Sequence, residues 1–406
     1  MLDVRQTKSD LEVRLLSSLA DIEQIELQWR ELSDCQNDPM TYFQSYDWCR
    51  SWLLSCSATE RDNLQVYTAW REDRLVGLIP FTIIKKFGVS RLVPLGSPHT
   101  QYAGCLLADE CFDRDFLDYL INYIKTSSNV DCIAIDDLPM RSIFADALVA
   151  LGHTFNPGET SQVLDLESFN TPQEFVSSVS KNKRKYRMRR LRKLSERGDV
   201  KLTPLSGGTQ GYKDIVQTAL AWKQDWLTTR GQPMANDKKE RLLNLLSNLS
   251  GSGMDEGSTV EGALALKLSV DGVPVAVEIG FVQHGHYYSY LGAFDPAWDN
   301  LSPGKVQIFL AKQWAIEQGL KAFDFMGGGG DYKAHNANKE VKLVSVCVPS
   351  TWMGHLFCRF WLTGLRPNLH SIFKQSSPHL KAFLVRGKAL FEGGSNNLPE
   401  KLDGKP

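Results

Sequence analysis

The sequence predicts an α/β (α+β) fold in which a mixed, mostly antiparallel sheet flanked by helices occurs twice. Residues 261–326 have the order strand, strand, strand, helix, strand, and residues 64–139 have the same order. The chain of 406 residues is also longer than one hydrophobic core usually organises. Each copy of the pattern therefore indicates a unit of domain size.

The later copy gives the clearer strand and helix signals. Two apolar runs, GALALKLSV and VPVAVEIGFV, flank Asp271-Gly272, which is a strong hairpin signal. A second turn at 284–286 leads into the strand YYSYLGAF. Pro303 suits the first turn of the following helix and Gly319 its end. The short strand AFDFM then runs into four glycines, 327–330.

The earlier copy pairs LQVYTAW with LVGLIPFTIIKK across a turn at 71–74, and a helix near 114–126 precedes the strand VDCIAIDDLP. The copies are offset by 198 residues at the hairpin turns and by 188 at the last strand. Only the later copy has Ser-Pro-Gly at the start of its helix, so the earlier one is expected to be non-catalytic. We predict domains at 1–158 and 159–350, a helical extension at 351–391 and a disordered tail at 392–406.

Composition narrows the classes of function. The net charge of −1 gives no general attraction to DNA. The eight cysteines show no CxxC or zinc-ligand spacing, so we expect reduced core residues and no metal. The first residues carry no apolar leader, and no apolar run reaches 18 residues. The expected location is the cytoplasm.

Residues 181–197 form the most strongly charged tract of the chain. It holds ten Lys/Arg and one acid, Glu196, along a helical pattern with a thin apolar stripe. Arg184, Arg187 and Arg190 are the candidate residues for binding a phosphorylated substrate, namely the acceptor of a transferred group. The alternative is a solvated helix face, for which this charge ratio is unusual.

Three stretches of the later copy resemble a known family: DGVPVAVEIGF, YLGAFDPAWDNLSPG and GLKAFDFMGGGGDYK. They resemble the GNAT acetyltransferase superfamily over about residues 165–335, in particular its tandem branch. That branch contains the CelD-type acetyltransferases of cellulose biosynthesis, which have a BioF2-like domain, and the FemAB peptidyltransferases. The resemblance implies tandem GNAT domains and acyl transfer from acetyl-CoA or another acyl-CoA.

The start of the later helix is the expected donor site. A helix N-terminus offers unpaired N–H groups and a positive dipole end to phosphate. Ser302 can cap the helix, Gly304 lets the backbone approach, and Lys305 adds charge. The GNAT signature Arg/Gln-x-x-Gly-x-Gly/Ala is replaced here by DNLSPGK, and the alternative is an ordinary helix cap.

Glu278 is the candidate general base. It shares one face of its strand with the small residues Ala276 and Gly280, so the sequence predicts space beside the carboxylate. Burial there raises a carboxyl pKa and suits it to take a proton from an ammonium acceptor. The alternative is a solvated or ion-paired carboxylate. Tyr288 and Tyr290 share a predicted face on the next strand, and either can protonate the leaving thiolate, with Tyr290 as the chosen candidate; the alternative is that these tyrosines are only strand-forming residues.

The end of the later copy matches a BioF2-like pattern of Asp-Phe, a glycine loop and Tyr-Lys. The resemblance implies that Asp324 and Lys333 bind substrate and that Tyr332 belongs to the catalytic set. The glycines do not form a Walker loop, because no Lys-Ser/Thr follows them.

The expected function is acyl-CoA-dependent N- or O-acylation of a sugar, a polysaccharide precursor or a small amine, in envelope or exopolysaccharide biosynthesis. One alternative is FemAB-like transfer from aminoacyl-tRNA. Another is a non-catalytic accessory protein of a polysaccharide synthase. The aromatic and basic segment 352–391 fits either packing on the protein body or peripheral association with a membrane or a synthase.

Overall fold

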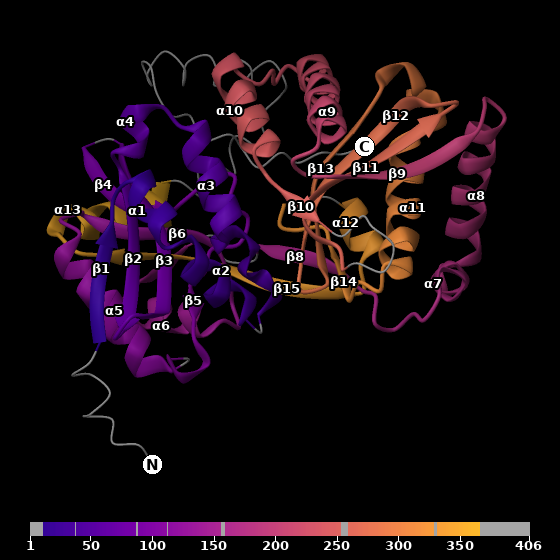
Figure 1. Cartoon of the computed structure of the whole chain (residues 1–406). Helices are drawn as coiled ribbons and strands as arrows, with labels where there is room; N and C mark the ends of the chain where they lie inside the picture. Colours follow the sequence, from indigo (N-terminus) through magenta and orange to yellow (C-terminus); the bar gives the residue numbers. More distant parts are fainter. Residues whose placement is uncertain are drawn as a thin grey trace. The chain divides into compact units, whose positions relative to one another are not determined.

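The computed structural model describes residues 11–365 apart from 37, 87, 112, 156–158, 253–258 and 329–330 (Figure 1). The chain divides into two compact units. Among the described residues, unit 1 combines those up to Thr160 with those from Val341 to Leu365, and unit 2 runs from Ser161 to Glu340. The predicted tail 392–406 and most of the predicted helical extension, 366–391, lie outside the described residues.

Unit 1 begins with strand β1 and a group of short helices and continues with a meander of strands. Its elements are β1 (Leu11–Leu16), α1 (Leu19–Gln24), α2 (Glu26–Asp34), the 3₁₀ helix η1 (Pro39–Gln44), α3 (Tyr46–Ser55), α4 (Ala58–Arg61), β2 (Leu64–Arg71), β3 (Arg74–Lys86), β4 (Val89–Pro94), β5 (Leu106–Leu107), η2 (Asp109–Cys111), α5 (Arg114–Ser127), β6 (Cys132–Pro139), α6 (Ile143–Leu151) and β7 (His153–Phe155). After unit 2 the chain adds β15 (Lys339–Pro349), α13 (Trp352–Leu356) and the π-helix η4 (Phe357–Leu365).

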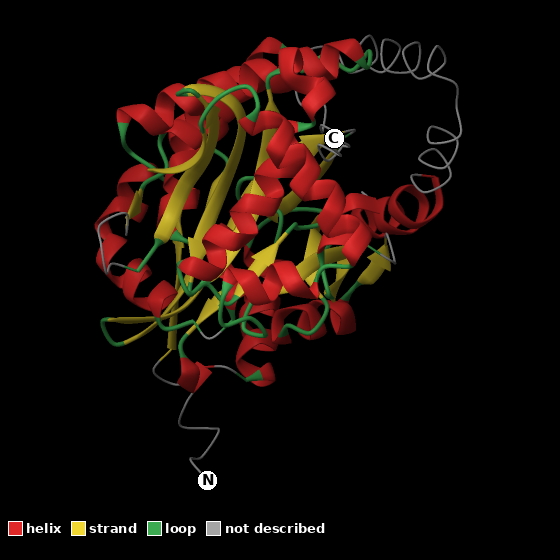
Figure 2. Ribbon diagram, turned by 90° about the vertical axis from the view of Figure 1, so that its right-hand side faces the viewer, coloured by secondary structure: helices red, strands yellow, loops and turns green. Residues whose placement is uncertain are grey.

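Helices lie against the strands in both units (Figure 2). In unit 1, strands β1 to β4 pair antiparallel in chain order, and β6 joins β4 as a parallel neighbour. The buried residues of helix α5 recur with helical spacing, so one face of this helix is buried. Asp113 caps this helix by accepting a hydrogen bond from Phe116 N at 2.7 Å. The acids at the start of α5 therefore serve the helix itself.

Unit 2 carries the stronger sequence signals. Its elements are β8 (Thr160–Asp165), α7 (Pro172–Ser178), α8 (Lys181–Ser195), β9 (Val200–Ser206), α9 (Gln210–Thr229), α10 (Asn236–Ser247), β10 (Gly251–Ser252), β11 (Glu261–Val270), β12 (Val273–Gln283), β13 (His286–Phe294), η3 (Pro296–Leu301), α11 (Pro303–Glu317), β14 (Ala322–Asp324) and α12 (Asp331–Asn336). Strands β9, β11, β12 and β13 are antiparallel neighbours in that order. β14 then pairs parallel with β13 and antiparallel with β8.

The two units repeat one arrangement. Each has a hairpin whose turn contains a left-handed residue, Glu72 at φ 53° in unit 1 and Asp271 at φ 49° in unit 2. Each also has one parallel strand pair among the described residues, β4 with β6 and β13 with β14. The second member of each pair ends close to another left-handed residue, Asp137 at φ 61° or Met326 at φ 55°. These shared features confirm the predicted tandem fold.

Strand β15 does not belong to the domain predicted for it, which ran from 159 to 350. It forms an antiparallel ladder with β6 and with β7, so from Val341 it belongs to unit 1. Its buried residues, including Val346 and Val348, complete the sheet that β6 would otherwise leave open on that side. A strand pattern alone does not specify its partner, because any sheet edge satisfies the same apolar run.

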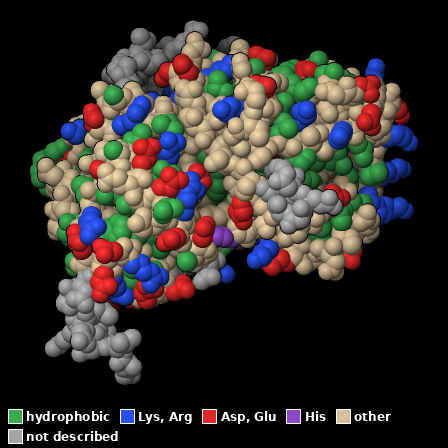
Figure 3. Space-filling view, viewed as in Figure 1, with side chains coloured by type: hydrophobic (Ala, Val, Ile, Leu, Met, Phe, Trp, Pro, Cys, Tyr) green, Lys and Arg blue, Asp and Glu red, His purple; other side chains and the backbone are tan. Residues whose placement is uncertain are grey.

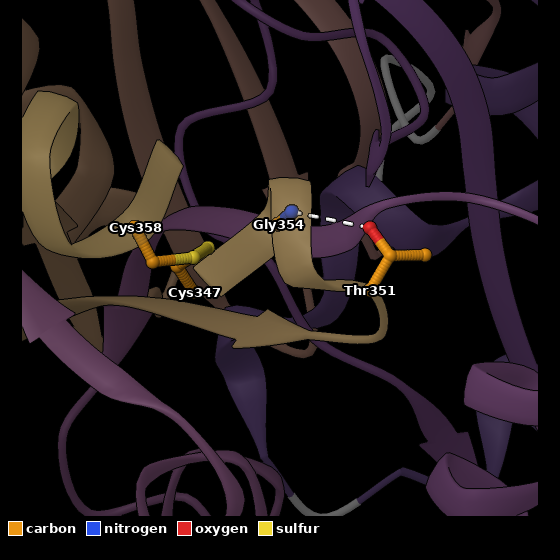
Figure 4. The surroundings of a disulfide bond; sticks show 4 residues. All are labelled: Cys347, Thr351, Gly354 and Cys358. Atoms are coloured by element: carbon orange, nitrogen blue, oxygen red, sulfur yellow. Dashed lines mark hydrogen bonds between the residues drawn. A yellow bond between two sulfur atoms is a disulfide. The ribbon is translucent and has the colours of Figure 1, made fainter. Parts of the chain in front are cut away.

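The cysteines were expected to be reduced, and this is wrong for two of them. Cys347 of β15 and Cys358 of η4 form a disulfide (Figure 4). The sulfur of Cys132 lies within 4.8 Å of both. No sequence motif marks this pair, since the two residues meet only when η4 folds back on β15. Within the described part of the chain, no helix is long and apolar enough to cross a bilayer.

Candidate active site

Glu278 lies in the middle of β12, the strand between β11 and β13. From Val275 onward this strand is buried on both faces, which follows from its nearly continuous apolar sequence. The Glu278 side chain is 3% exposed, so the alternative of a solvated carboxylate is excluded. Ser289 Oγ on β13 donates a hydrogen bond to Glu278 Oε1. A carboxylate is thus held inside the sheet by one hydroxyl.

The surroundings of Glu278 raise its pKa toward neutral pH. Burial raises the pKa of Glu278 from 4.5 to about 7, while the Ser289 hydrogen bond and the charges of Lys333 and Lys223 act against this rise. A group with a pKa near 7 exchanges protons readily at physiological pH. Glu278 therefore meets the electrostatic requirement for a general base.

The open space beside Glu278 lies on a different strand from the predicted one. The side-chain position of Gly280 is filled, because a Cβ there would collide with the ring of Tyr287. On β13, however, Gly292 pairs with Glu278 and is exposed. A Cβ at Gly292 would lie 3.0 Å from Glu278 Oε2 and would meet no other atom within 4 Å. The free space next to the carboxylate is thus on the Gly292 side.

Tyr290 is the extra residue of a β-bulge. The register shifts between Ile279, which pairs with Leu291, and Gly280, which pairs with Ser289. The Tyr290 ring lies 5.0 Å from that of Phe281, whose side chain points to the face of β12 opposite Glu278. Burial raises the pKa of the Tyr290 phenol. The structure therefore does not bring Tyr290 onto the face of Glu278, although bulges often occur beside active sites.

The N-terminus of α11 has the expected positive charge but not the expected side-chain capping hydrogen bond. Ser302 adopts a left-handed conformation at φ 53° and makes no side-chain capping hydrogen bond, so its predicted capping role is wrong. Gly304 leaves room, since a Cβ there would meet only Phe294, at 3.5 Å. Lys305 Nζ lies 5.7 Å from the Tyr186 ring of the basic helix α8.

The basic helix α8 lies beside this helix start. Arg190 donates a hydrogen bond of 2.8 Å to the carbonyl of Asn300, and its guanidinium lies 5.1 Å from the Tyr186 ring. Burial alone would raise the pKa of Tyr186, but the hydrogen bond with Arg190 and the charge of Lys305 hold it below its ordinary value. Arg190 and Lys305, which are far apart in the sequence, thus belong to one cationic cluster.

Arg187, one turn earlier on α8, contacts α12 instead. Arg187 Nη2 and Lys312 Nζ donate to the same oxygen, Asn336 Oδ1, at 2.6 and 2.8 Å. Burial and the neighbouring charges of Arg187 and Lys183 lower the pKa of Lys312 well below its ordinary value. Arg184 is half-buried on the same side of α8. The remaining bases face outward, and Lys and Arg side chains gather where α8 lies, at the right-hand edge of Figure 3.

Asp324 is an internal residue that fixes the end of β14. It is 0% exposed and accepts hydrogen bonds from Ser161 Oγ at 2.7 Å and Met326 N at 2.6 Å, and it pairs with His286 Nε2 at 3.2 Å. This network explains the left-handed backbone of Met326 and favours a positioning role for Asp324. Its predicted substrate contact stays a prediction.

The side chains after the glycine loop lie close to the same strand end. Lys333 Nζ donates to the Gly327 carbonyl at 2.7 Å. The Tyr332 ring lies edge-on to Phe325, with ring centres 6.5 Å apart. Lys333 also contributes to the charge that acts on Glu278. The structure therefore brings Glu278 and Lys333 into one electrostatic environment, whereas Tyr332 packs on the core.

Ser289 and Gly292 were missed by the sequence analysis. The two-residue turn at 284–285 sets the pairing of Gly280 with Ser289, so Ser289 was within reach of a register argument. Gly292 was not, because the bulge at Tyr290 shifts its partner by one residue. Lys312 gave no signal, since a lysine within an apolar helix pattern is normally placed at the surface.

Residues 181–334, which span α8 to α12, match a family model described as an acetyltransferase (GNAT) domain. This segment is therefore similar to GNAT acetyltransferase domains. The match supports an acyltransferase, and the sheet with its parallel β13–β14 pair is the GNAT-like fold that the sequence predicted.

Solved structures support the same fold over both units. FemX is similar with a TM-score of 0.55 and 11% identity, over 83% of this chain and 97% of that one. The C-terminal domain (DUF2156) of a protein assigned as a lysylphosphatidylglycerol synthetase from Agrobacterium fabrum has a TM-score of 0.51 and 13% identity, over 86% of this chain and 99% of that one. At such identities the likeness shows the fold alone. A comparison with curated proteins gave no match.

Proposed function

We propose that the protein transfers an acyl group from acetyl-CoA or another acyl-CoA to the amine or hydroxyl of a sugar, a polysaccharide precursor or a small amine. The observation that carries this proposal is Glu278, a buried carboxylate with a pKa of about 7 inside the acetyltransferase domain. It rests beside the gap at Gly292, through which an acceptor reaches it.

Glu278 acts as the general base. An amine acceptor is an ammonium ion at neutral pH and has no free electron pair until it loses a proton. Glu278 takes that proton, the nitrogen forms a bond to the acyl carbon, and the bond from that carbon to sulfur breaks. Ser289 orients the carboxylate, and Lys333 with Lys223 keeps its pKa from rising further. For a hydroxyl acceptor the same carboxylate removes the proton as the oxygen attacks.

The donor binds at the start of α11. Its pyrophosphate needs positive charge and backbone N–H groups, and the cluster of Arg190, Lys305 and the helix end supplies both. Gly304 provides the space for close approach. Beyond Tyr288 the pairing of β13 with β14 stops, which leaves that edge of β13 for the extended arm of the donor. Tyr290 and Tyr332 stay the candidate proton donors to the departing sulfur, although Tyr290 packs against Phe281 on the face opposite Glu278 and Tyr332 packs against Phe325.

The acceptor carries phosphate or another anionic group. Arg184, Arg187 and Lys333 are the proposed contacts, since Arg187 on α8 reaches Asn336 of α12, the helix that also carries Lys333. A nucleotide-sugar or a lipid-linked sugar diphosphate fits this chemistry. A BioF2-like, CelD-type role in exopolysaccharide synthesis, carried out in the cytoplasm, is the pathway that we propose.

The strongly basic helix also favours a second candidate, aminoacyl transfer from tRNA. Ten Lys/Arg with one acid over 181–197 suit a polyanion of that size. FemX has this fold, but its low identity carries no substrate to this chain. A non-catalytic accessory role is less favoured, because such a role gives no reason to bury a carboxylate whose pKa is about 7 next to free space.

Calorimetric titration with acetyl-CoA tests the donor site. We expect one donor per chain, and Gly304→Glu should abolish binding because it places bulk and negative charge where the phosphates lie. Gly211→Glu is the matched control, since Gly211 lies in the first turn of α9 and is exposed. Equal binding by both variants, or tighter binding of aminoacyl-tRNA than of acetyl-CoA by the wild type, would reject the acyl-CoA assignment.

A further inference from the structure

The C-terminal helical segment of unit 1, formed by α13 and η4, is apolar on two opposite sides. Phe357, Cys358 and Leu362 point inward and belong to a buried apolar cluster. Trp352, Leu356 and Phe360 point outward and are 70%, 45% and 60% exposed. They follow one another at intervals of four residues and so form one stripe, here called the exposed stripe. A helix packed on one side normally has a polar outer side, so an apolar outer side indicates that something else covers it.

The segment cannot turn to bury the exposed stripe, because polar contacts fix its orientation. Thr351 Oγ1 and Ser90 N donate to the Asp131 carboxylate at 2.6 and 2.8 Å, and Ser350 N donates to the Asp131 carbonyl at 2.8 Å. A Cβ at Gly354 would collide with that carbonyl, so the backbone of α13 rests directly on it. The disulfide between Cys347 and Cys358 adds a covalent tie (Figure 4). The exposed stripe is therefore held outward.

The charge of the surrounding sequence indicates the kind of partner. Residues 351–391 contain six Lys/Arg, three His and no Asp or Glu. The whole chain, by contrast, has 47 acids and a net charge of −1. A segment that is both cationic and aromatic is matched by a surface that is anionic and apolar at once.

We propose that the exposed stripe is a docking surface for an anionic lipid bilayer. Trp and Phe side chains favour the boundary between headgroups and acyl chains, and neighbouring Lys and Arg are attracted by anionic headgroups. The proposed association is peripheral, with the exposed stripe at the boundary between headgroups and acyl chains. The proposal is independent of the acyl-transfer chemistry, which lies in unit 2.

Sedimentation of the full chain with vesicles tests this docking. Vesicles of phosphatidylcholine alone are compared with vesicles containing phosphatidylglycerol, at low and high salt. We expect binding to the anionic vesicles, weakened by salt. Trp352→Ser and Phe360→Ser should each lower the partition coefficient on the order of tenfold, because each removes a large apolar group from the interface. Leu27→Ser is the matched control, as Leu27 is 73% exposed on α2.

Circular dichroism and thermal unfolding establish that the variants are folded, which is expected because both side chains point outward. Failure of the wild-type chain to bind anionic vesicles overturns the proposal. So does equal binding by the serine variants, or equal binding to neutral vesicles. If sedimentation velocity shows a dimer that Phe360→Ser dissociates, the exposed stripe is an interface between two copies instead.

Discussion

Replacing Glu278 by Gln should stabilise the protein at high pH while it slows the reaction. The pKa of Glu278 is raised from 4.5 to about 7, so between these values the folded protein holds a proton that the unfolded chain has lost. Stability therefore falls as the pH rises through this window and levels off above it. The difference corresponds to about 3 kcal/mol between the two protonation states, as an order of magnitude. Gln keeps the shape and the Ser289 contact but has no charge to bury.

Urea unfolding at several pH values between about 5 and 8 measures this effect. The wild type should lose stability relative to Glu278→Gln as the pH rises, and the two should be similar at the acidic end. The turnover number of the variant should fall about 10²-fold if Glu278 is the base. Glu317→Gln, at an exposed position at the end of α11, is the control and should change neither quantity. A variant less stable than the wild type at the alkaline end would refute the raised pKa, and unchanged turnover would remove Glu278 from the mechanism.

Two further predictions concern the other parts of the site. Changing the half-buried arginines of α8 to Gln should raise the acceptor KM, flatten its dependence on salt and cost about 1 kcal/mol of stability through lost hydrogen bonds. The variant set is Arg184, Arg187 and Arg190, and the control set on the exposed side is Lys185, Arg189 and Arg192; equal effects of both sets on KM would indicate a general charge effect. Asp324→Ala should cost about 3 kcal/mol in urea unfolding, because it leaves the buried donors of Ser161 and Met326 without an acceptor. A loss of activity without a loss of stability would instead assign Asp324 to substrate contact.

The strands and helices of unit 2 were predictable because their signals are local. Asp271-Gly272 defines one turn, and Pro303 with Gly319 brackets α11. The position of Glu278 on a central strand followed from the same patterns. These features depend on residues within one hairpin or one helix, where backbone preference and periodicity act directly.

The features that the sequence did not reveal depend on register and on distant contacts. The bulge at Tyr290 moves Gly292 opposite Glu278 and turns Tyr290 toward Phe281. Tyr287 fills the space that alternation assigned to Gly280. The contacts of Arg187 and Lys312 with Asn336 join segments more than a helix length apart in sequence. A one-residue shift in a strand exchanges its faces, so such details follow from the assembled fold.

The return of β15 to unit 1 has a consequence for biosynthesis. β6 ends at Pro139, whereas its partner β15 begins at Lys339, so the ribosome makes all of unit 2 before the partner strand exists. A nascent unit 1 therefore emerges with the β6 edge unpaired, and an open strand edge is a template for association with other chains. Until β15 has been made, association through this edge competes with its native pairing.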